Sequence, residues 1–162
     1  MRTLILGLGN PILRDDAVGL RVVQTLRVLL PDRQDVDVEE DYHGGLRLME
    51  RLVGYDHAII IDAIQTGAPA GTIHTLTPSG RPTQRSASPH DVDLPTALAL
   101  GRQSGAHLPA DKDILIIGVE AAEVLDFGET LTPAVEAAIP ALIEAVLGLL
   151  KRKEGPWSVQ DE

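Results

Sequence analysis

Apolar residues occur along this chain either in short unbroken runs or at helical spacing, and the two patterns predict alternating strands and helices. Three short apolar runs bounded by glycine or polar residues are typical of buried parallel strands. They occupy residues 3–8, 58–61 and 114–119. Residues 36–40 alternate apolar and charged positions, which predicts a strand nearer the sheet edge. Residues 71–76 predict a further strand beside 58–61, reached through a turn at 67–70.

Helical spacing of apolar residues predicts the segments between the strands. The first helix is expected from about residue 18 to residue 30, with Asp15 or Asp16 as its N-terminal cap. Shorter helices are expected near residues 46–52 and 94–101.

The last helix has the clearest start signal. Thr132 is a suitable capping residue, and Pro133 suits the first helical position because its missing N–H needs no partner there. Pro140 is expected to kink the helix. The expected buried face comprises Val135, Ile139, Leu142, Ile143, Val146 and Leu149.

This order of elements predicts an α/β fold, a three-layer α/β/α sandwich with a mostly parallel central sheet of about five strands. A length of 162 residues suits one domain with one core. Residues 1–150 are therefore expected to form a single domain, and residues 151–162 a polar C-terminal tail.

Three residues far apart in the chain are candidates for one metal site. Asp16 starts the helix after the first strand, and Asp62 directly follows the apolar run 58–61. In open α/β sheets ligands bind beyond the carboxyl ends of the strands, so both residues belong at that edge. His90 lies in the proline-rich loop 77–92, which is long enough to fold over the same edge. Two carboxylates and an imidazole suit a borderline divalent ion.

Each of these residues also has a plainer interpretation. Asp16 could serve only as a helix cap, Asp62 could cap a turn, and His90 could make a polar contact within its loop. His43 lies beside Gly44 and Gly45, either as a surface residue or as an additional ligand.

The GLGN sequence at residues 7–10 follows a strand but is not a dinucleotide fingerprint. Ile12 stands where the third glycine of that fingerprint would be. The two glycines are therefore expected to allow a tight turn and close packing.

Composition narrows the function classes. The formal net charge of −10 disfavours nucleic acid as a partner, since such binding depends on Lys and Arg. No apolar run is expected to approach the roughly 20 residues that span a bilayer, and the N-terminus lacks a signal-peptide pattern. The absence of cysteine excludes disulfides and a thiol nucleophile. A cytoplasmic protein without membrane attachment is expected.

The chain resembles the hydrogenase maturation proteases from Met1 to about Leu150. The resemblance depends on several motifs in this order rather than on any one. They are GLGNPILRDDAVG at 7–19, IIIDAIQTG at 59–67, PAGTI at 69–73, SPHD at 88–91, and IIGVE with LTPAVEAAIP within 116–140.

The resemblance implies an endopeptidase with a phosphorylase/hydrolase-like fold. It would remove the C-terminal extension from the precursor of a nickel–iron hydrogenase large subunit. The nickel is expected to arrive in that precursor, with zinc or cadmium as surrogates, and the protease is expected to be a monomer. The ligand and catalytic positions of the family fall on Asp16, Asp62 and His90. The metal would polarise the carbonyl or activate water, or Asp16 or Asp62 would act as general base, as in an aspartic-type peptidase.

Substrate recognition in the family involves an acidic residue followed by a Gly-Gly-Thr-type loop. The corresponding residues here are Glu40, Asp41, His43, Gly44 and Gly45, and Tyr42-His43 replaces smaller residues. This departure leaves the hydrogenase class of the substrate open.

Two rival functions remain at this stage. A nickel-sensing chaperone would bind the precursor without cutting it. A peptidyl-tRNA hydrolase also opens with GLGNP, but that family continues differently after the proline, and the acidic charge disfavours tRNA. Neither a GxSxG elbow nor an HExxH helix is present.

Overall fold

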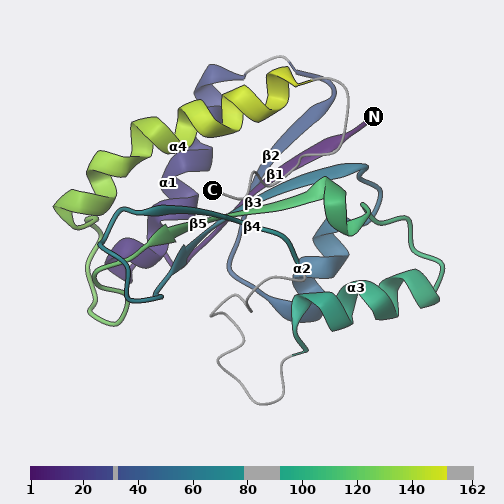
Figure 1. The fold of residues 1–162 in the computed structure, drawn as a ribbon, viewed down its shortest axis with the longest axis horizontal. Coiled ribbons are helices and arrows are strands. Elements are labelled where there is room, and N and C mark those ends of the chain that lie inside the picture. Colours follow the sequence, from purple (N-terminus) through teal and green to yellow (C-terminus); the bar gives the residue numbers. More distant parts are fainter. Residues whose placement is uncertain (31–32, 79–91, 153–162) are drawn as a thin grey trace.

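The computed structural model describes residues 1–30, 33–78 and 92–152. Their elements alternate between strands and helices along most of the chain (Figure 1). The strands are β1 (Thr3–Leu8), β2 (Val36–Asp41), β3 (His57–Ile64), β4 (Ile73–Leu76) and β5 (Ile114–Glu120). The helices are α1 (Val18–Leu29), α2 (Gly45–Leu52), α3 (Leu94–Gln103) and α4 (Pro133–Lys151), with short 3-10 turns η1 (Arg14–Ala17) and η2 (Asp111–Asp113).

The sheet has the strand order β2-β1-β3-β5-β4, and all neighbours are parallel except β4 and β5. The expected position of β4 beside β3 is wrong, because β5 lies between them. The reason is the turn before β4. Gly71 N donates to Glu120 O (2.8 Å), and Glu120 N donates to Thr72 O (2.8 Å). These two bonds start an antiparallel ladder on the far side of β5.

Two hydrophobic layers cover the sheet, which confirms the three-layer prediction (Figure 1). Alternate side chains of each central strand face α1 and α4 on one side and α2 and α3 on the other. In β3, for example, Ile59 and Ile61 belong to the first layer, whereas Ala58 and Ile60 belong to the second. The core is therefore aliphatic on both faces of the sheet.

The start of α1 differs from the sequence prediction. The residue before the helix is Ala17, and no side chain caps the first turn. Asp15 and Asp16 lie one turn earlier, in η1, where their carboxylates accept hydrogen bonds from other segments. Thr132 does precede α4, but its side chain makes no capping bond. The close packing predicted for the glycines is confirmed, because a Cβ on Gly7 would collide with the Gly19 carbonyl.

Among the described residues, one helix is long and apolar enough to cross a membrane by length and composition alone. This is α4, with 19 residues, whose apolar sequence is interrupted by Glu136 and Glu144. The helix packs on the sheet through Val135, Leu142, Val146 and Leu150, which are buried. A core helix of a soluble protein passes the same test.

Candidate active site at the carboxyl edge of the sheet

Asp62 lies inside β3 and not after it. The strand continues to Ile64 because Ala63 and Ile64 pair with Val119 and Glu120 of β5. Asp62 is fully buried, and its Oδ1 accepts a hydrogen bond from Ala63 N (2.9 Å). By the alternation of the strand it points to the α2 and α3 face of the sheet, two residues from the carboxyl end. Burying a carboxylate is costly unless it is paired or hydrogen-bonded.

Asp16 lies in η1, which contacts β3. Its half-buried carboxylate accepts a hydrogen bond from Asn10 N (2.9 Å), which closes the loop after β1. Asp16 and Asp62 are therefore both at the carboxyl edge, on elements that touch each other. This agrees with the sequence argument for the edge.

His90 lies outside the described residues, so the convergence of Asp16, Asp62 and His90 stays a prediction. Within residues 1–30, 33–78 and 92–152, no three His, Asp or Glu side chains are grouped so that they could hold a metal ion. The two carboxylates fit the oxygen-donor half of such a site.

Asp15 is a residue whose importance the sequence did not reveal. It is fully buried beside the candidate site, and four donors converge on its carboxylate. Oδ2 accepts from Ala122 N (2.9 Å) and Glu123 N (3.0 Å), and Oδ1 accepts from Thr132 N (2.7 Å). The Thr132 hydroxyl donates as well (2.7 Å to Oδ2). Burial by itself would raise the pKa of Asp15, but these hydrogen bonds outweigh it and lower the pKa below its ordinary value.

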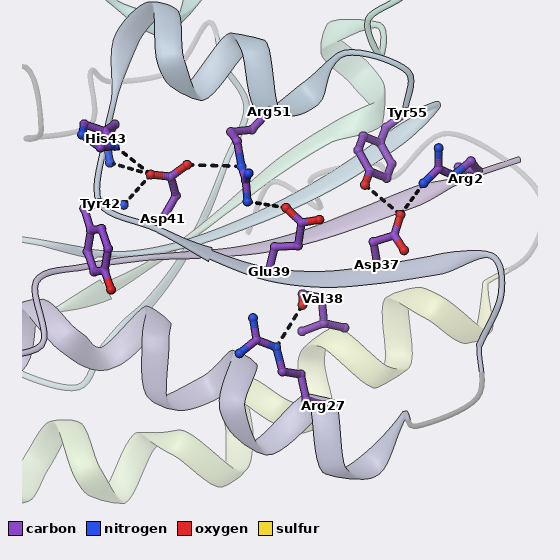
Figure 2. A network of polar contacts seen from close by, with 10 residues as sticks. All are labelled: Arg2, Arg27, Asp37, Val38, Glu39, Asp41, Tyr42, His43, Arg51 and Tyr55. Carbon is purple, nitrogen blue, oxygen red and sulfur yellow. Dashed lines mark hydrogen bonds and ion pairs between the residues drawn. The ribbon is translucent and has the colours of Figure 1, made fainter.

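The segment assigned to substrate recognition begins in the last two residues of β2, at the carboxyl end of that strand, and continues past Asp41 to Tyr42 and His43 (Figure 2). His43 Nδ1 lies 2.9 Å from Asp41 Oδ1, and Arg47 Nη1 lies 3.2 Å from His43 Nε2. Because an arginine only donates, Nε2 accepts and the proton of a neutral His43 sits on Nδ1, facing Asp41. Burial would raise the pKa of Asp41, but His43 and Arg51 hold it below its ordinary value. His43 therefore has to leave Arg47 before Nε2 can bind a metal.

The five recognition candidates do not form one cluster. Glu40 pairs with Arg27 of α1 (2.7 Å), on the opposite face of β2 from Asp41. Gly45 has a left-handed backbone (φ 61°), and a Cβ there would lie 2.7 Å from Val92 O. Glycine is thus required at Gly45 by conformation and by the close approach of the chain.

Pleating places Asp41 and Asp62 on the same face of the sheet. Gly7 pairs with both Glu40 and Ile61, and Leu8 pairs with Asp41, so Leu8 separates the two aspartates. Two strand spacings correspond to about 10 Å between their Cα atoms. The recognition segment and the buried aspartate therefore flank one apolar side chain.

A second buried carboxylate, Glu120, was also missed. It accepts hydrogen bonds from Thr66 N (2.9 and 3.0 Å), and His74 Nε2 lies 3.2 Å from Oε1. Burial would raise the pKa of Glu120, but Thr66 and His74 lower it. His74 pairs with Gly118, which pairs with Asp62, so all three share a row. The Ile64 side chain fills the space over Gly118, so it lies between Asp62 and His74.

The chain is similar over most of its length to hydrogenase maturation proteins. Residues 20–149 match a family model described as hydrogenase maturation protease. The hydrogenase 2 maturation protease of Escherichia coli strain K12 is 36% identical over 157 residues, covering 93% of this chain and 92% of that protein. The hydrogenase expression/formation protein HupM of Azotobacter chroococcum is 32% identical over 155 residues, covering 92% of this chain and 72% of that protein.

Solved structures of two endopeptidases are also similar to this chain over most of its length. The hydrogenase maturating endopeptidase HybD of E. coli has a TM-score of 0.76 at 32% identity, covering 94% of this chain and 93% of that chain. The solution structure of an endopeptidase from E. coli has a TM-score of 0.75 at 35% identity, covering 96% of this chain and 95% of that chain.

Proposed function

This chain belongs to the family of hydrogenase maturation proteases, and we propose that it cuts the C-terminal extension from the precursor of a nickel–iron hydrogenase large subunit. One observation carries the proposal. The chain is 36% identical to a hydrogenase 2 maturation protease across 93% of its own length. The placement of Asp16 and Asp62 at the carboxyl edge of the sheet supports it chemically.

We propose that the precursor brings its own nickel to this edge. Asp16, Asp62 and His90 would contact that ion, and thereby place the scissile peptide bond beside them. A carboxylate pair with one imidazole leaves positions for ligands from the precursor. Zinc or cadmium would occupy the same set of donors as surrogates.

The chemical step is the hydrolysis of one peptide bond. Water adds to the carbonyl carbon, loses a proton to a base, and the bond to nitrogen breaks as the leaving amine takes up a proton. Asp62 suits the base because its charge is enclosed near the end of β3, where water is limited. Alternatively the nickel of the substrate supplies the activation, with Asp16 and Asp62 only as ligands. We expect the reaction in the cytoplasm, with the protease as a monomer.

The test is incubation of the purified protein with nickel-loaded and nickel-free precursor, read as a change in precursor size. Cleavage of the nickel-loaded form alone is expected. Asp62→Asn should abolish it, whereas Asp111→Asn should not, because Asp111 lies before β5 at the opposite edge and pairs with Arg102 (2.8 Å). Binding of the loaded precursor without cleavage would show a nickel-sensing chaperone instead. Cleavage independent of nickel would contradict the proposed role of the nickel, but not the proposed peptidase activity.

A further inference from the structure

The connection between β5 and α4, residues 121–132, is fastened to the segment that carries Asp16. Gly128 N donates to Ile12 O (2.8 Å), and Arg14 N donates to Gly128 O (3.0 Å). Asp15 N donates to Glu123 O (3.0 Å). The Asp15 carboxylate accepts three hydrogen bonds from backbone N–H groups of the connection. The two segments therefore hold each other in one arrangement.

The tip of this connection is also fixed internally. Glu123 Oε1 accepts hydrogen bonds from Leu125 N (2.7 Å) and Asp126 N (2.9 Å). Arg14 Nε donates to Thr130 O (3.2 Å) on the return side. Hydrogen bonds therefore hold the backbone between Glu123 and Thr130 at both ends.

Large apolar side chains project from this fixed tip into solvent. Leu125 is 83% exposed and Phe127 is 81% exposed, and Phe127 is the only phenylalanine of the chain. Ile12, whose carbonyl binds the tip, is 46% exposed. Exposed apolar side chains that gather at one place mark interaction sites. A tightly bonded backbone that displays them is organised for a partner.

We propose that Ile12, Leu125 and Phe127 form an apolar docking surface for the hydrogenase precursor, and this inference rests on the proposed function. Continuity with the candidate site identifies the occupant. Ile12 lies in the same closed loop as Asp16, because Asn10 N donates to Asp16 Oδ2 (2.9 Å) and Asn10 Oδ1 accepts from Ile12 N (3.2 Å). A precursor held at Asp16 therefore passes directly over this surface.

The charge of the connection specifies the occupant further. Residues 121–132 carry Glu123, Asp126 and Glu129 and no Lys or Arg. Backbone hydrogen bonds from Asp126 and Leu125, with a smaller contribution from the charge of Arg14, lower the pKa of Glu123 below its ordinary value. The segment that docks here is apolar and is flanked by at least one basic residue.

The experiment compares cleavage kinetics of Phe127→Ser and Leu125→Ser with those of Val28→Ser on the nickel-loaded precursor. Val28 is a matched control, since it is 77% exposed but lies at the far end of α1 from Asp16. Phe127→Ser is expected to lower kcat/KM by about 10- to 100-fold, the effect of losing one buried apolar side chain. The loss should appear in KM, with kcat within about threefold. Val28→Ser should match the wild type.

Three results overturn the inference. The first is wild-type kcat/KM in both Phe127→Ser and Leu125→Ser. The second is an equal loss in Val28→Ser. The third is a wild-type dimer in sedimentation that Phe127→Ser converts to monomer without changing kcat/KM, since the surface would then join two copies of this chain. Thermal denaturation of each variant checks that it is folded.

Failure of the proposed function is distinguishable from failure of the surface. If the wild type leaves the nickel-loaded precursor uncut, the proposed function fails. The affinity of the wild type and the variants for that precursor then tests the docking surface separately. Weaker binding by Phe127→Ser than by Val28→Ser supports it, and equal binding overturns it. Asp126→Lys adds a charge test. It should weaken binding and reduce its salt dependence, whereas an unchanged affinity contradicts the basic flank.

Discussion

Removal of the Asp15 carboxylate should destabilise the whole carboxyl edge, because four donors from the two ends of the distant connection 121–132 depend on it. A hydrogen bond to a charged group contributes about 1.5–3 kcal/mol, but these four share one acceptor and water enters once it is gone. We therefore expect Asp15→Ala to lower the free energy of unfolding by about 3–5 kcal/mol, as for a broken buried network. For a domain of this size that corresponds to roughly 6–20 °C in Tm.

Two milder variants grade the effect. Asp15→Asn keeps the shape but turns one acceptor into a donor that faces N–H groups, and about 2–3 kcal/mol is expected. Thr132→Val removes only the hydroxyl, for about 1 kcal/mol. Urea denaturation at pH 7 should thus rank the variants Asp15→Ala, Asp15→Asn and Thr132→Val in decreasing order of loss.

The same variants have a defined pH dependence. A carboxyl with a lower pKa in the folded than in the unfolded state stabilises the protein above the unfolded pKa, and loses this contribution as the pH falls through the folded pKa. The ordinary value for Asp15 is 3.8, and its folded pKa is lower. The gap between wild type and Asp15→Asn should therefore be constant from pH 7 to about pH 5, and should shrink below about pH 4. A gap under about 0.5 kcal/mol at pH 7, or one that is unchanged at pH 3, refutes the reasoning.

Further predictions concern the recognition segment and the metal. His43→Ala should slow cleavage of the loaded precursor by roughly 5- to 150-fold, less than His90→Ala does, and wild-type rates would make His43 a plain surface residue. Gly45→Ala should lower the free energy of unfolding by about 1–3 kcal/mol more than Gly54→Ala, because both have a positive φ but only Gly45 meets a backbone oxygen within 4 Å; equal losses in denaturation would contradict the contact with Val92. The protein should take up nickel, zinc or cadmium weakly and lose it as the pH falls through the histidine range, and calorimetry should show a lower affinity for Asp62→Ala.

The sequence predicted the strands correctly wherever a local pattern of apolar residues marks them. The apolar run at Thr3–Leu8 stops at glycine and gave β1 with the observed bounds, and the alternation after Val36 gave an edge strand. The end of β3 was misplaced because a carboxylate at Asp62 ordinarily ends a buried strand. Pairing with Glu120 and its neighbours in β5 extends the strand beyond Asp62. The sequence of β3 alone does not show this pairing.

The site was predictable only in part, for a related reason. The edge that holds Asp16 and Asp62 follows from the rule for open α/β sheets. The partners of Asp15 are separated from it by 107 to 117 residues, and no periodic pattern connects such positions. An Asp before a helix has a local explanation as a cap, which here is wrong. A buried carboxylate that serves a distant loop is recognisable only once the loop is in place.

The row of paired residues across the sheet places Asp41 of the candidate recognition segment near Asp62 of the candidate site. Asp41 and Asp62 point to the same face, with Leu8 between them. Their spacing of about 10 Å is the length of three extended residues, so one short stretch of a bound peptide spans both. At that spacing two carboxylates repel by about 0.4–1.7 kcal/mol for effective dielectric constants of 80 to 20. Arg51 and His43 offset the charge of Asp41. If the proposed function holds, we expect a change at His43 to act on cleavage through the bound peptide and through the charge of Asp41, without His43 binding the metal.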